Sequence, residues 1–196
     1  MGITKGINIE CSDIVGAGGI RNILIRTWAD GDTVTYTNTS TVHGISSIKH
    51  NAADATWFNY EFKQELPSLT VTAARENGST SYECALSFMM PDMDAGKSAA
   101  LQSLMDTCMM VIAVGNNGKS YVLGVSQKYS NEKKEIRNQT YASMTGAEGA
   151  TGAGINDDNG WTVTMGCKQW EAPRLYTGAL TLYTNAGSGT GTSTTT

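Results

Sequence analysis

The chain has 196 residues, of which 16% are charged, with a formal net charge of −4 and a sequence pI of about 5.1. This length suits one domain with a substantial core, and the acidic balance argues against a surface that grips nucleic acid through clustered Lys and Arg. The sequence contains no apolar run of roughly 18 residues, so we expect no transmembrane helix. The first residues lack the basic and apolar regions of a signal peptide, which favours synthesis in a reducing cytoplasm.

Alternation of polar and apolar residues predicts several strands in the first half of the chain, after an N-terminal arm at residues 1–19. The expected strands cover residues 20–28, 33–37, 57–66, 68–76 and 80–90. Residues 38–55 are polar and irregular apart from Ile45 and Ile48. The dipeptide Asn77-Gly78 predicts a tight hairpin between the last two strands. Because the strands at 57–66, 68–76 and 80–90 each have one apolar and one polar face, we expect them to form a meander.

One helix is expected after the strand at 80–90. Pro91 ends that strand because proline cannot donate a ladder hydrogen bond, and Asp92 or Asp94 can cap a helix that runs to Asp106. Its apolar residues fall at helical spacing and are Leu101, Leu104, Met105 and Cys108. The apolar run at 109–114, the turn residues at 116–118 and the segment 120–124 then predict a β-hairpin.

The last third of the chain begins with a long glycine-rich connection at residues 138–160, and such connections are usually functional or mobile. A long strand is expected at 161–170, with these residues pointing inward: Trp161, Val163, Met165 and Cys167. Residues 179–183 are expected to add an edge strand, and 185–196 form a low-complexity Gly/Ser/Thr tail. The sequence therefore predicts a mainly β domain at 20–184 with one α-helix.

No motif in the sequence predicts catalysis, a metal site or a cofactor. Residues 113–120 fit a relaxed phosphate-binding loop, but β-like residues follow where such a loop requires a helix. His43 and His50 match no metal-ligand spacing, and the Asp-rich residues 156–160 lack the spacing of a calcium loop. The candidate acid and base carboxylates lie on polar strand faces, where solvated carboxylates are common, and are Glu61, Glu65, Glu76 and Glu83.

The four cysteines are widely spaced, and none belongs to a C-x-x-C pair. Cys84, Cys108 and Cys167 each fall on an apolar stripe. We therefore interpret them as small buried hydrophobic residues rather than as a disulfide framework.

Several segments, taken in their order along the chain, resemble the tail tube (major tail) proteins of tailed bacteriophages. They are residues 60–63 (Tyr-Glu-Phe-Lys), 77–83 (Asn-Gly-Ser-Thr-Ser-Tyr-Glu), the helix at 94–107, 111–118 running into 121–124, 157–165 (Asp-Asp-Asn-Gly-Trp-Thr-Val-Thr-Met) and 170–173 (Trp-Glu-Ala-Pro). These segments span residues 57–173, which is most of the chain. A similar fold serves the inner tubes of contractile injection systems.

The resemblance implies a tail-tube-like β-sandwich or barrel whose strands join a large β-barrel shared between subunits, with the helix outside. Six subunits would form a ring, and rings would stack with one another and with other tail proteins in the virion, so that DNA passes through without specific binding. The candidates for lining the bore are Asn59, Glu61, Lys63, Glu65, Ser81, Glu83 and Ser87. The candidates for stacking the rings are Ile3, Ile7, Ile9, Tyr141, Met144 and Ile155.

Two other functions remain open from the sequence. One is a different virion assembly protein, such as a capsid decoration or tail-completion protein, which would form closed oligomers that never elongate. The other is a carbohydrate- or surface-binding β module, which would need Trp28, Trp57 or Trp170 to be exposed together in a groove.

Overall fold

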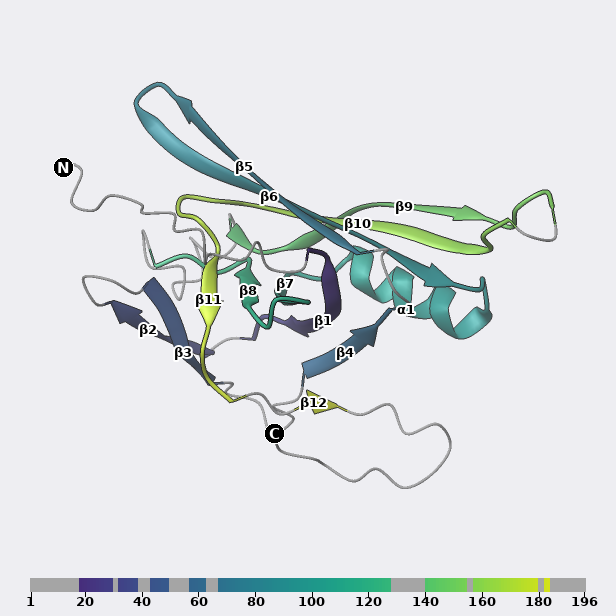
Figure 1. The fold of residues 1–196 in the computed structure, drawn as a ribbon, viewed down its shortest axis with the longest axis horizontal. Coiled ribbons are helices and arrows are strands. Elements are labelled where there is room, and N and C mark those ends of the chain that lie inside the picture. The colour runs from purple at the N-terminus through teal and green to yellow at the C-terminus, as the bar shows by residue number, and fades with distance from the viewer. Residues whose placement is uncertain are drawn as a thin grey trace, which may run out of the picture.

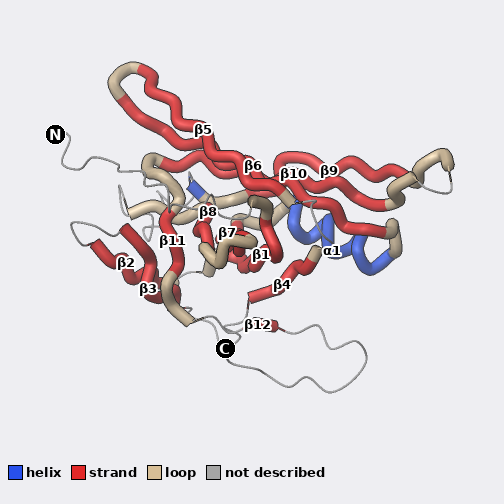
Figure 2. Tube along the Cα trace, in the orientation of Figure 1, coloured by secondary structure: helices blue, strands red, loops and turns tan. Residues whose placement is uncertain are grey.

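The structure is a computed structural model, and it describes residues 18–29, 32–38, 43–49, 57–62, 67–127, 140–154, 157–179 and 182–183. In this part the chain is mainly β, with two sheets and a single α-helix (Figure 1, Figure 2). This confirms the mainly β fold class expected from the sequence. The predicted arm at 1–19, apart from its last two residues, and the predicted tail at 185–196 lie outside the described residues.

The larger sheet has eight strands in the order β12-β4-β1-β7-β8-β11-β3-β2. These strands are β1 (Ile20–Thr27), β2 (Thr33–Asn38), β3 (His43–Lys49), β4 (Trp57–Glu61), β7 (Met109–Gly115), β8 (Ser120–Leu123), β11 (Arg174–Tyr176) and β12 (Leu182–Tyr183). Every residue of β7 is buried. That pattern shows that the larger sheet is covered on both faces at its middle, as the continuous apolar run in the sequence indicates.

The smaller sheet is fully antiparallel and has the strand order β5-β6-β10-β9. Its strands are β5 (Ser68–Glu76), β6 (Ser79–Pro91), β9 (Ser143–Ala150) and β10 (Gly160–Gln169). The hairpin of β5 and β6 and the hairpin of β9 and β10 extend beyond the larger sheet in opposite directions (Figure 1). The helix α1 (Ala95–Met105) lies beside β4 under the β9–β10 end.

Two hydrophobic cores hold these layers together. The first core lies between the two sheets and α1 and includes Ile23, Leu86, Phe88, Leu101 and Val163. The second core lies on the other face of the larger sheet and draws on β1, β2, β3, β4, β7 and β8. Because strands from both ends of the sheet order share this second core, the larger sheet curls around it.

The alternation in β1 explains how one strand serves both cores. Ile23 and Ile25 belong to the first core, and Leu24 belongs to the second. Burying each such side chain contributes about 1.5–3 kcal/mol to stability. A slip of one residue would exchange the two faces of the strand, so this register is strongly favoured. The same periodicity in β6 and β10 is as the sequence predicted.

The predicted three-stranded meander is wrong. β4 pairs with β1 and β12 in the larger sheet, whereas β5 and β6 form a hairpin in the smaller sheet. The hairpin itself is confirmed, with positive φ values of 48° at Asn77 and 80° at Gly78. β4 also ends at Glu61, and residues 63–66 of the predicted strand lie outside the described residues. Pro67 stands where the chain leaves one sheet for the other, and periodicity alone cannot show that change of layer.

Residues 43–49 form strand β3, although the sequence predicts no regular structure between 38 and 55. Ile45 and Ile48 both reach the second core despite a spacing of three, which does not fit a period of two. The register explains this, because Tyr36 pairs with Ile45 while Thr35 pairs with Ser47, so Ser46 is an extra residue in a β-bulge. A bulge shifts the alternation by one residue. The short strand β11 was also not predicted.

The glycine-rich stretch predicted as a loop at 138–160 contains strand β9, so this prediction is wrong in its central part. The structure gives the glycines a packing role in that strand. A Cβ added at Gly149 would lie 2.8 Å from the Trp161 ring, so the aromatic side chain occupies the space that a side chain would need. Glycine weakens a strand on propensity grounds, and here pairing with β10 and contact with Trp161 outweigh that cost.

The helix α1 begins with the cap that the sequence predicted. The Asp94 side chain accepts a hydrogen bond from the Lys97 backbone N–H at 2.8 Å and forms an ion pair with the Lys97 Nζ at 3.0 Å. Leu101 and Leu104 are buried, as expected. Met105, however, is 61% exposed, so its predicted place in the apolar stripe is wrong because the helix ends at this residue.

The cap makes the stability of the helix depend on pH. The hydrogen bond from the Lys97 N–H holds the pKa of Asp94 below its usual value, so the cap stabilises the folded state above the unfolded pKa of about 4 and is lost as the pH falls through the lower folded pKa. We expect Asp94→Ala to be destabilising at pH 7 and to differ progressively less from the wild type below pH about 4. Urea unfolding followed by circular dichroism at several pH values measures this difference.

The matched control is Gln102→Ala, an exposed helix position without a titratable group. Its difference from the wild type should not change with pH. A destabilisation by Asp94→Ala that stays constant down to pH 2 would contradict the prediction.

Candidate functional site

The smaller sheet presents a broad polar face to solvent. Residues that alternate with the core-facing positions share this face, because directly paired residues point the same way. We call it the polar outer face, and it includes Ser68, Thr70, Thr72, Ala74, Glu76, Ser79, Ser81, Glu83, Ala85, Ser87, Met89, Ser143, Gly146, Glu148, Thr162, Thr164, Gly166 and Lys168. None of these residues is buried in the single chain. Lys168 lies directly opposite Glu83 in the register. The same face also carries Glu76 on β5 and Glu148 on β9, so it holds more acidic than basic groups.

The predicted bore-lining residues do not lie on one face of the chain. Ser81, Glu83 and Ser87 belong to the polar outer face on β6, whereas Asn59 and Glu61 lie on β4 in the larger sheet. Lys63 and Glu65 are outside the described residues. The two sets are therefore separated by a whole sheet and the first core. A sequence pattern gives the face of each strand but not the sheet to which the strand belongs.

On β4, the two polar residues are linked to each other and to β1. The Asn59 amide donates to the Glu61 carboxylate at 2.9 Å and accepts from the Asn22 amide at 2.8 Å. Glu61 is exposed. This chain of hydrogen bonds fixes the polar face of β4 without forming a catalytic pair.

Of the predicted ring-stacking residues, Ile3, Ile7, Ile9 and Ile155 lie outside the described residues. Tyr141 packs partly buried against the second core, and Met144 packs partly buried against the first. In the single chain these two side chains therefore serve mainly in packing.

The smaller sheet has two open edges within the described chain. β5 and β9 each pair with one neighbour. The Asp92 N–H donates to the Asn159 C=O at 2.8 Å, and in an antiparallel ladder this bond sets which residues alternate toward each neighbour. When this alternation is followed across the registers of β6 and β10, the N–H groups of Val71 and Ala73 point to the open edge of β5. The N–H of Ala147 points to the open edge of β9.

The hairpin of β5 and β6 is exposed on both faces near its tip. Every residue from Thr70 to Ser79 is exposed, and Val71 retains 42% of its surface although it points to the core side of the sheet. An isolated two-stranded hairpin is marginally stable in water, and a long edge without proline or lysine is a template for pairing with another chain. These features are typical of a strand pair that is covered in an assembly.

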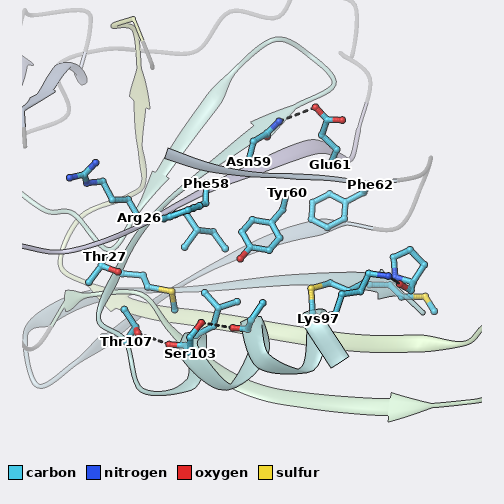
Figure 3. Close-up of a pocket in the computed structure, with 18 residues that line it drawn as sticks. Arg26, Thr27, Phe58, Asn59, Tyr60, Glu61, Phe62, Lys97, Ser103 and Thr107 are labelled. Atoms are coloured by element: carbon cyan, nitrogen blue, oxygen red, sulfur yellow. Dashed lines mark hydrogen bonds between the residues drawn. The ribbon is translucent and has the colours of Figure 1, made fainter. Parts of the chain in front are cut away.

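An open groove of about 660 Å³ runs between β4 and α1. Figure 3 shows that Phe58, Tyr60 and Phe62 point from β4 toward the helix, whereas Asn59 and Glu61 point away. Phe58 is 50% exposed in this groove, and burial raises the pKa of Tyr60.

The chemistry of this groove does not indicate an active site. Two hydroxyls that line it are engaged by backbone carbonyls of α1, because Ser103 donates to the Ala100 C=O at 2.7 Å and Thr107, just after the helix, donates to the Ser103 C=O at 2.6 Å. Lys97, at one end, is held by Asp94 and by the Pro91 C=O. The groove is thus a mainly aromatic and apolar surface.

The tryptophans are not arranged as a binding platform. Trp28 is 8% exposed and Trp57 is 2% exposed, and both belong to the second core. A carbohydrate- or surface-binding module would need these tryptophans exposed together with Trp170. Two of the three are buried in the core instead.

Within the described residues, no group of three or more His, Cys, Asp or Glu side chains could hold a metal ion. None of the described helical structure is long and apolar enough to cross a membrane.

Comparisons of the chain with protein-family models, with curated proteins and with solved structures gave no match. The class of the protein is therefore defined by its own fold: a mainly β domain of two sheets and one helix. Its most distinctive surface is the smaller sheet, with a polar outer face that holds more acidic than basic groups and two edges that are open within the described residues.

Proposed function

We propose that this protein is a structural subunit that assembles with copies of itself into stacked rings, forming a tube of the phage-tail type through which DNA passes. The observation that carries the proposal is the smaller sheet, which combines a solvated polar face with two edges that no other described strand covers. Pairing β5 of one subunit with β9 of the next would continue the sheet around a ring. Closure would remove both edges, as in a β-barrel.

The composition of the polar outer face supports its role as the wall of a channel for DNA. Its side chains are mainly hydroxyls and methyl groups, and its one cation, Lys168, lies opposite Glu83. Binding of DNA depends on phosphate neutralisation by Lys and Arg, which releases counterions. A wall with few free cations would let DNA slide without being held.

The groove between β4 and α1 supplies a second surface suited to a neighbouring subunit. Phe58 lines this groove, and Met105 is the last residue of α1; both are large hydrophobic residues exposed in the single chain. Burial of such side chains contributes roughly 25 cal/mol per Å², and obligate interfaces are more hydrophobic than ordinary surfaces.

Electron microscopy of the purified protein over a series of concentrations tests the proposal. We expect tubes with a continuous central channel and a regular axial repeat. Closed rings or trimers that never elongate would instead favour a capsid decoration or tail-completion protein, and monomers at every concentration would overturn self-assembly. A contractile-system inner tube would give the same tubes, and a co-assembled sheath would distinguish it.

The variant Ala73→Pro tests whether the open edge of β5 forms the subunit contact. Proline removes the edge-facing N–H while leaving the bonds to β6, and proline is tolerated on edge strands. We expect the concentration needed for tubes to rise at least roughly tenfold, which corresponds to about 1.4 kcal/mol per subunit.

The matched control for this variant is Ala73→Thr, which keeps the N–H and suits a strand. It should form tubes like the wild type. Circular dichroism and thermal unfolding establish that both variants are folded. Unchanged assembly of folded Ala73→Pro would exclude the β5 edge as the contact.

A further inference from the structure

We infer that Cys84 and Cys167 form a reversible disulfide that covalently joins β6 to β10 under oxidising conditions. The inference does not depend on the proposed function. It assigns a redox modification site to the centre of the smaller sheet, where the single chain otherwise holds its two middle strands by hydrogen bonds and packing alone.

The register brings the two cysteines directly together. Cys167 is the Cα partner of Cys84 in a ladder that runs without a register shift from Gly160 to Gln169. Counting from the bond between the Asp92 N–H and the Asn159 C=O makes this a hydrogen-bonded pair, whose Cα atoms are about 5.5 Å apart in antiparallel sheets. Disulfides span Cα separations of about 4.4–6.8 Å. The register therefore places the two cysteines within the range that a disulfide spans.

The two thiols also point the same way and contact each other. Both cysteines are free, and their side chains belong to the first core. They share a hydrogen bond, which raises the pKa of Cys84 and lowers the pKa of Cys167. The Cys167 Sγ in turn donates to the Gln169 Oε1 at 3.7 Å. This arrangement makes Cys84 the donor toward Cys167 and makes Cys167 the thiol that ionises first.

Solvent reaches the pair only through Cys167, which is 7% exposed, whereas Cys84 is 1% exposed. A small oxidant such as hydrogen peroxide is therefore expected to react first with Cys167. Cys108 is not part of this pair and has no such partner in the register.

The reaction with a hydroperoxide balances as two steps. The Cys167 thiolate attacks the O–O bond of hydrogen peroxide, which gives a sulfenic acid and hydroxide. The Cys84 sulfur then attacks the sulfenic sulfur, an S–S bond forms, and the S–O bond breaks to release water. In total the two thiols lose two protons and two electrons, and one peroxide becomes two waters. A dithiol reductant reverses the oxidation.

The primary test uses the wild-type protein, so it does not depend on a variant that folds. Native protein is treated with hydrogen peroxide, free thiols are alkylated in denaturant, and the protein is digested with trypsin without reduction. We expect residues 76–97 and 138–168 to appear as one linked species, which separates into two peptides on reduction. Both peptides alkylated after full peroxide treatment would overturn the inference, and so would oxidation of Cys167 to sulfinic acid without a link.

A second test isolates the pair. The double variant Cys11→Ser/Cys108→Ser keeps only these two thiols, and we expect its intact mass to fall by about 2 Da on oxidation. Its urea midpoint should rise on oxidation and return on reduction, because the crosslink restricts the unfolded chain. Adding Cys84→Ser as a matched control should abolish both changes. A dimer linked between chains would count against the inference.

Discussion

Replacing Arg174 by alanine is expected to lower the free energy of unfolding by about 3 kcal/mol, because it removes a buried guanidinium and leaves the partly buried Glu171 and Gln127 without their donor. Arg174 on β11 is 7% exposed. It contacts Glu171 through two nitrogens at 3.2 and 2.9 Å and donates to Asn38 at 2.7 Å and to Gln127 at 2.9 Å. Its guanidinium also lies 5.1 Å from the ring centroid of Tyr36. One side chain therefore ties β11 to the end of β2 and to the segment after β8.

The expected loss is at the low end for a buried ion pair because the Glu171 side chain retains 20% of its exposure. In thermal unfolding it corresponds to a fall of roughly 6–12 °C in Tm for a chain of this size. Arg174→Lys keeps the charge but not the planar fork, so it should lose an intermediate amount. The control Arg21→Ala, at an exposed position of β1, should change stability by less than about 0.5 kcal/mol. Equal effects at both positions would contradict this account of Arg174.

Replacing Phe88 by alanine is expected to cost about 3–5 kcal/mol, since it opens a cavity in the first core. Phe88 on β6 is 1% exposed, and its ring lies 5.1 Å from that of Phe62 and 6.4 Å from that of Tyr60. These contacts join the smaller sheet to β4 and the segment after it. Urea unfolding should show a lower midpoint with an unchanged slope if the native fold is kept.

Phe58→Ala is the matched control, because it makes the same change at a residue that is 50% exposed. At concentrations where the protein is a single chain, its cost should be below about 1 kcal/mol. Under the proposed function, the same variant should weaken assembly more than it weakens folding. A loss of stability as large as that of Phe88→Ala would show that Phe58 is part of the core.

The sequence by itself determined the elements whose evidence is local. The alternation in β6 and β10 predicted which residues enter the first core, and the apolar run at 109–114 predicted strand β7. Asn77-Gly78 specified a tight turn through its two positive φ values, and Asp94 specified the start of α1. Each of these depends on neighbours within a few residues, so composition and spacing are sufficient.

Tertiary structure alone decided the features that depend on distant partners. The exchange of the chain from the larger to the smaller sheet near Pro67 separates Glu61 from Glu83, which local periodicity placed together. The bulge at Ser46 and the cover of Gly149 by Trp161 made strands of segments that have the composition of loops. The direct opposition of Cys84 and Cys167 follows from a register between strands that lie far apart in sequence. In each case a long-range pairing or packing contact outweighs the local conformational preference. The local sequence does not reveal such a contact.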